Sequence, residues 1–228
     1  MKLNTQQIAE INQTLIEKGL IYEDIKLEVT DHIASEIENQ LENNKSNFNE
    51  VFDAVFSKWE TELKLKSNWW SSGFVAPKIV IDKYALQVKK QFKFAALYDL
   101  MFSFIMVTIT NIYPQEIAYT VSKIVYVACY SLISLMLVYC WFVNWKLKTT
   151  TIFGKIFRST FFACICILIN YVFNSGDHLY RHYFRDSIGS QFMQWFMHGF
   201  FMFMGVYLIL MAIEHFKNVK KYKLSISK

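Results

Sequence analysis

Residues 94–113 read FAALYDLMFSFIMVTITNIY, an apolar run of about 20 residues in which Asp99 is the only charged side chain. A helix rises about 1.5 Å per residue, so a run of this length spans the hydrocarbon core of a bilayer, which is roughly 30 Å thick. Pro114 follows and ends the helix because its nitrogen carries no hydrogen. Three further runs lie at about 121–141, 156–173 and 192–213. None alternates between apolar and polar residues, as strands of a membrane barrel do, so the sequence predicts four transmembrane helices.

The composition separates the chain into two parts with different surroundings. Of its 228 residues, 54% are hydrophobic and 19% are charged, whereas soluble domains carry about 25% charged residues. Residues 1–64 hold 6 Lys and 13 Asp or Glu, a net charge of −7, and the rest of the chain carries +12. The four cysteines lie in apolar runs, where thiols act as small buried side chains. These figures exclude a disordered protein, a secreted disulfide-rich scaffold and a single soluble enzyme domain.

Lysine and arginine gather on one side of the predicted membrane region. Fourteen of them flank the apolar runs on that side, five within 78–93, four within 146–158 and five within 217–228. The other side has three, Lys123, Arg181 and Arg185. Cytoplasmic segments carry the excess of Lys and Arg, and four spans place both termini on one side, so both termini are predicted to be cytoplasmic. The start of the chain lacks the unbroken apolar run of an export signal. We expect a multi-pass cell-membrane protein, in a bacterium an inner-membrane protein.

The first 64 residues are predicted to form three amphipathic helices. In each, apolar residues recur every three or four positions, which is the period of one helix face. Thr5 is a candidate cap for the first helix, and Gly19 ends it. The second runs over about 22–40, and Asn47 or the serine before it caps the third. A domain of about 60 residues is near the lower limit for independent folding, so we expect support from the membrane region or from a partner.

The predicted fold class is all-α, a small cytoplasmic three-helix domain followed by a four-helix transmembrane bundle. An aromatic and basic linker with a juxtamembrane helix occupies 65–93, and helical pattern resumes at Lys78 and is expected to continue into the first span. The four spans lie within 94–216, and a basic cytoplasmic tail follows at 217–228.

The N-terminal domain resembles a known family in its second and third helices. The residues that carry the resemblance are Leu15, Lys18-Gly19-Leu20, Glu28-Val29-Thr30-Asp31-His32-Ile33-Ala34, Ile37-Glu38, Phe48, Phe52 and Trp59. They are similar to the small three-helix HAAS domain at the front of bacterial multi-spanning membrane proteins. The resemblance covers about a quarter of the chain and implies an inner-membrane protein with a cytoplasmic interaction or regulatory domain. It implies no catalytic residue.

One candidate site lies on the second predicted helix. Glu28, His32 and Glu36 are four residues apart and therefore share a face, and Asp31 lies beside them. One interpretation is a pH-sensitive docking surface or a carboxylate–imidazole metal site. The other is a solvated helix face with local ion pairs, because one helix supplies too few ligands for a closed site.

A second candidate is the loop between the third and fourth spans, on the outer face. If this loop is helical, His178, His182 and Asp186 share a face, and two imidazoles with a carboxylate form a set that binds a divalent metal. His198, early in the fourth span, could approach from the same side. The competing interpretation is an amphipathic loop whose Arg and His meet lipid headgroups. No cofactor is expected apart from this metal.

A third candidate is Asp99, because a carboxylate inside a span is costly and faces protein or water. We expect an ion pair with Lys155 or Arg158, or snorkelling to the interface, and the alternative is a proton or ion pathway. Glu214 lies at a similar depth at the end of the fourth span. In that span a face of His198, Met202, Gly205, Ile209 and Ala212 is suited to close helix packing.

Three functions remain open on the sequence. The first is a non-enzymatic regulatory or protein-interaction protein that acts through its acidic cytoplasmic domain, which would contact a protein partner, another copy, or the chain's own basic juxtamembrane segment. The second is a metal-binding membrane enzyme or sensor, and the third a small transporter or channel subunit. The sequence contains no P-loop, GxSxG, CxxC or HExxH motif. Nucleic acid is not an expected partner, because the basic residues flank the membrane runs and the N-terminal domain is acidic.

Overall fold

The structure is a computed structural model that describes residues 2–43, 47–69, 74–147, 149–183 and 187–226. Seven helices and two short strands make up this described part. They are α1 (Thr5–Glu17), α2 (Glu23–Asn43), α3 (Phe48–Leu63), β1 (Leu65–Lys66), β2 (Ala76–Pro77), α4 (Lys78–Ile112), α5 (Gln115–Lys146), α6 (Ile152–Tyr183) and α7 (Ile188–Ile226). The all-α class predicted from the sequence is confirmed.

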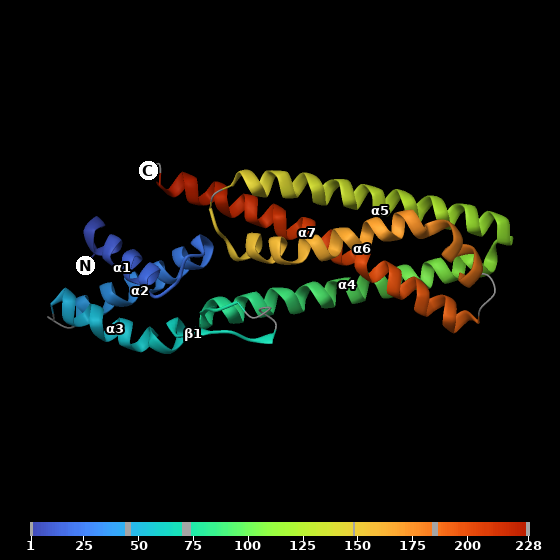
Figure 1. The fold of residues 1–228 in the computed structure, drawn as a ribbon. Helices are drawn as coiled ribbons and strands as arrows, with labels where there is room; N and C mark the ends of the chain where they lie inside the picture. Colours follow the sequence, from blue (N-terminus) through green and yellow to red (C-terminus); the bar gives the residue numbers. More distant parts are fainter. Residues whose placement is uncertain (1, 44–46, 70–73, 148, 184–186, 227–228) are drawn as a thin grey trace. The chain divides into compact units, whose positions relative to one another are not determined.

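The chain divides into two compact units, shown in Figure 1. The first comprises residues 1–88, 149–152 and 217–228, and the second comprises 89–148 and 153–216. The first unit therefore holds the three short helices, the start of α4 and the segment that connects α5 to α6. The second holds most of the four long helices.

In the first unit, α2 packs against both α1 and α3. The predicted stripe on α2 forms the centre of the core, and all five members are buried: Tyr22, Ile25, Val29, Ile33 and Ile37. Val80, Ile81 and Tyr84 at the start of α4 are also at most 1% exposed. The start of α4 therefore belongs to the same compact unit as the three short helices.

The ends of α1 follow local chemistry. Asn4, and not Thr5, is the N-cap: its side chain accepts a hydrogen bond from the Gln7 amide, and the Gln7 side chain accepts one from the Asn4 amide, both at 2.9 Å. This reciprocal arrangement satisfies two helix-end donors, which the Thr5 hydroxyl alone would not do. Gly19 ends the helix with φ +85°, a conformation that favours glycine.

The linker contains an element that the sequence analysis missed. β1 and β2 pair antiparallel, with Leu65 opposite Pro77 and Lys66 opposite Ala76. The Lys78 amide donates to the Lys64 carbonyl at 2.9 Å, which continues the pairing up to the start of α4. This two-residue ladder closes the chain between α3 and α4.

Four helices are long and apolar enough to cross a membrane, and they lie side by side in Figure 1. The candidate spans are Lys78–Ile112, Glu116–Lys146, Ile152–Phe173 and Ile188–Lys221. α4 runs unbroken from Lys78, as predicted. The helices extend beyond the apolar runs. The polar residues at either end keep the helical backbone hydrogen bonds, although they lie outside the length that the hydrocarbon core requires.

The core of the second unit contains side chains from all four long helices. Trp195, Leu137, Phe157 and Leu168 are completely buried. Gly205 of the predicted packing face allows close approach, since a Cβ there would lie 2.9 Å from Ile133 Cγ2. Small residues on α7 therefore set its spacing from its neighbours, as the sequence pattern predicts.

Candidate functional site

Asp24 lies in the first turn of α2, where its carboxylate binds the connection between α5 and α6. The amide of Ile152 donates to both carboxylate oxygens, at 3.2 Å to Oδ1 and 3.1 Å to Oδ2. The Glu23 amide in turn donates to the Thr150 carbonyl at 2.9 Å. A helix start has amides without intrahelical acceptors, so Asp24 acts as an N-cap for α6 from a distant part of the chain. We call this pair of contacts the α2–loop contact.

The environment of Asp24 alters its titration. Burial raises the pKa of this carboxyl from 3.8 to about 6, although hydrogen bonds from Ile152 and Ile25 and the charge of Lys83 act in the opposite direction. The charged form is therefore disfavoured in the folded protein. The α2–loop contact consequently depends on a group that changes its charge near neutral pH.

The predicted acidic face of α2 is divided between two neighbours. Glu28 forms an ion pair with Lys83 of α4. Glu36 binds Lys58 of α3 at 2.5 Å and accepts a hydrogen bond from the Trp59 indole at 3.3 Å. The hydrogen bond from Lys58, more than the one from Trp59, lowers the pKa of Glu36. Two of the four predicted residues thus hold helices of the first unit together.

The other two members of this face, Asp31 and His32, are exposed on α2. Over the described ranges, no group of three or more His, Cys, Asp or Glu side chains is placed to hold a metal ion. On this face of α2, one carboxylate and one imidazole are exposed to solvent. This arrangement suits a contact surface better than a chelating site.

An ion pair also joins α3 to α4. Lys78 binds Glu62 at 2.5 Å, so the acidic domain contacts the basic juxtamembrane helix at Lys78 and at Lys83. These pairs are partly exposed, so water and salt weaken them. They orient the start of α4 on the domain, while the buried apolar side chains supply most of the stability.

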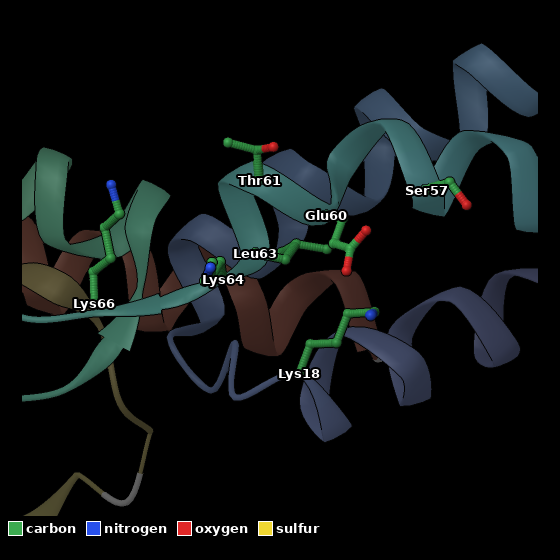
Figure 2. Close-up of a pocket in the computed structure, with 7 residues that line it drawn as sticks. All are labelled: Lys18, Ser57, Glu60, Thr61, Leu63, Lys64 and Lys66. Carbon is green, nitrogen blue, oxygen red and sulfur yellow. The ribbon is translucent and has the colours of Figure 1, made fainter.

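Figure 2 shows a hollow of about 590 Å³ in the first unit. Lys18 from the end of α1, Lys64 from the end of α3 and Lys66 from β1 surround it, together with Glu60. Lys18 and Lys64 occupy the C-cap positions of their helices. Cations are favoured there because helix carbonyl ends carry partial negative charge, which accounts for this local excess of lysine.

The predicted outer metal site is only partly within the described structure. The backbone of His178 and His182 belongs to α6, which continues to Tyr183, so the expected loop is helical over this stretch. The side chains of both histidines and the whole of Asp186 lie outside the described residues.

Asp99 is completely buried on α4, and its environment differs from the expected one. Ser103 donates to Oδ1 at 3.4 Å. Across the described chain, no lysine or arginine forms an ion pair with it, so the predicted pair with Lys155 or Arg158 is wrong. The physical reason is depth: Asp99 lies against Gly199 of α7, whereas Gly154, beside Lys155, lies against His215, 16 residues further along α7. At 1.5 Å per residue this separation is about 24 Å, so Asp99 does not lie at the depth of Glu214 either. Asp99 fills the space that Gly199 leaves open.

His198 belongs to a cluster of aromatic rings. Its ring centroid lies 4.6 Å from that of Tyr171, and its Nδ1 is 2.7 Å from the Gln194 carbonyl. The Tyr130 hydroxyl donates to the His198 carbonyl at 2.6 Å. Glu214, near the other end of α7, is half-buried. His198 thus has a packing role within the second unit.

The α2–loop contact was missed at the level of sequence. Asp24 is one of several acidic residues in the N-terminal domain, and the contact joins positions 128 residues apart. The available indication was its place at a helix start, where a carboxylate is a natural acceptor.

Comparison with known proteins leaves this site without a precedent. No protein-family model, no curated protein and no solved structure matches the chain. The HAAS-like resemblance therefore stays a prediction.

Proposed function

We propose that this chain is a non-enzymatic, regulatory or protein-interaction protein of the bacterial inner membrane. Both termini are cytoplasmic, and the acidic N-terminal domain binds a protein partner or a second copy of the chain. The four membrane-length helices and the excess of Lys and Arg on one side support this topology.

The observation that carries the proposal is the α2–loop contact. Asp24 caps the start of α6, and Glu23 binds the Thr150 carbonyl, so the N-terminal domain holds the connection between two apolar helices. Binding at the domain can therefore alter the connection between α5 and α6.

The partner-binding surface is proposed to be acidic. Asp31 on α2 and Glu50 and Asp53 on α3 are exposed, whereas Glu28 and Glu36 are used in internal ion pairs. A basic protein surface fits this pattern of charge, and its binding would weaken as salt rises.

Affinity purification after mild detergent extraction tests this proposal. Wild type is compared with a variant carrying Asp31→Lys and Asp53→Lys, which reverses two exposed charges without touching the core. We expect a protein recovered in stoichiometric amount with wild type to be lost or strongly reduced with the variant and at high salt. Lys146→Glu, which changes an exposed charge on α5, serves as the control and should leave the recovery unchanged.

Two results would count against the proposal. One is the recovery of identical proteins with wild type and with the charge-reversed variant. The other is a purified wild type that contains a stoichiometric divalent metal which His178→Ala removes, because that result favours the metal-binding alternative.

A further inference from the structure

A hollow of about 170 Å³ lies in the second unit, between the last turns of α5 and the second turn of α6. Its lining consists of Trp141, Asn144, Trp145 and Arg158. The hollow therefore combines two indole rings, one amide and one guanidinium at the end of two membrane-length helices. None of the functions considered so far makes use of it.

Asn144, one of the residues that line this hollow, has a side-chain amide without a partner in the described chain. The residue is 1% exposed, and neither its side-chain oxygen nor its nitrogen has a hydrogen-bond partner among the described residues. Buried amides are hydrogen-bonded in folded proteins, because the loss of water is otherwise uncompensated. A ligand that satisfies Asn144 must offer both an acceptor for its N–H groups and a donor for its oxygen.

Arg158 indicates that the ligand of this hollow is negatively charged. Its side chain is half-buried, and no carboxylate forms an ion pair with it in the part of the chain that the structure describes. The planar guanidinium matches a phosphate with two parallel hydrogen bonds. An anionic group with phosphate geometry is thus the complement of this side chain.

The two tryptophans indicate where the ligand comes from. Trp141 stacks on Phe161 with ring centroids 4.5 Å apart, whereas Trp145 is 76% exposed. Tryptophan gathers at the boundary between lipid and water, where the ring contacts hydrocarbon and the N–H reaches polar groups. A hollow beside such rings lies at the depth of lipid headgroups and not in bulk solvent.

We propose that this hollow binds the headgroup of an anionic phospholipid. Arg158 donates to the phosphate oxygens, and the Asn144 amide donates to the phosphate and accepts from a headgroup hydroxyl. A phosphoglycerol headgroup provides both kinds of group and a net negative charge, whereas phosphocholine lacks a hydroxyl donor and is neutral overall. The indoles contact the glycerol backbone and the first part of the acyl chains.

Native mass spectrometry of the purified full-length protein tests the proposal. The protein is equilibrated with mixed micelles that contain phosphatidylglycerol or phosphatidylcholine. Wild type should retain one phosphatidylglycerol and release phosphatidylcholine. Arg158→Gln should weaken retention at least about tenfold, since it removes the charge-assisted hydrogen bonds. Lys146→Gln removes an exposed charge at the same end of α5 and should retain the lipid as wild type does.

Asn144→Leu leaves Arg158 in place and keeps the volume of the side chain at position 144. This variant therefore tests the proposal if Arg158→Gln does not fold. We expect it to weaken phosphatidylglycerol retention while circular dichroism shows unchanged helix content. Undiminished retention by this variant, or by a folded Arg158→Gln, would overturn the proposal. Complete displacement of the bound lipid by millimolar inorganic phosphate would also overturn the proposal, because it would show that the hollow binds a free anion.

Discussion

Replacement of Asp24 by asparagine should strengthen the α2–loop contact at neutral pH. In wild type the pKa of Asp24 is about 6, compared with 3.8 for an ordinary aspartate. Asp24 therefore binds its proton more tightly when the α2–loop contact is formed than when the contact is broken. The contact is consequently most stable below about pH 4. As pH rises to 6, this difference removes about 3 kcal/mol from the stability of the contact. Asparagine keeps an acceptor for the Ile152 amide but has no charge to bury.

Hydrogen exchange of the Ile152 amide, measured by mass spectrometry on protein in nanodiscs, is the assay. After correction for the intrinsic rate, protection in wild type should fall by about 100-fold between pH 4 and pH 7, and Asp24→Asn should show constant protection. Asp31→Asn changes an exposed carboxylate of the same helix and should behave as wild type. Equal pH dependence in wild type and Asp24→Asn would refute the assignment of the effect to Asp24.

Three further variants test the packing. Gly19→Ala should lower the free energy of unfolding by about 1–2 kcal/mol, because φ is +85° there and a Cβ would lie 3.3 Å from Leu65; unchanged chemical denaturation would contradict this. Gly199→Ala should cost about 1–3 kcal/mol in a thermal melt through overlap with Asp99, whereas Gly189→Ala, whose Cβ meets nothing within 4 Å, should cost nothing. Lys83→Gln should cost less than about 1 kcal/mol, with the difference disappearing in 1 M salt; a larger, salt-independent loss would show that Lys83 does more than pair with Glu28.

The spans were predictable because hydrocarbon thickness imposes a minimum length on any helix that crosses it. The run at 94–113 meets that length in the sequence itself, and α4 contains it. The start of α4 at Lys78 was also predicted, because helical pattern resumes there in the sequence. The far ends of α6 and α7 were less predictable: the apolar runs stop at 173 and 213, whereas the helices continue to Tyr183 and Ile226.

The contacts of the buried polar groups could not be predicted. Asp99 stood out in the sequence, but its neighbour Gly199 is far away along the chain, and the expected cation proved wrong. Asp24 did not stand out, because an acidic residue at a helix start is ordinary. The two-residue strands β1 and β2 are too short to show a period. Local patterns therefore predict the elements, whereas pairing between distant elements requires the structure.

Photo-cross-linking in intact cells tests most directly whether the acidic domain binds another protein chain. A photoreactive residue replaces Ala54, which is exposed on α3 beside Asp53, or Leu132, which is 64% exposed on α5. Our account predicts one discrete protein adduct from position 54, reduced by the Asp31→Lys and Asp53→Lys changes, and no such product from position 132. If the photoreactive residue at position 132 yields a protein adduct and the one at position 54 does not, the proposed binding surface on the acidic domain is contradicted.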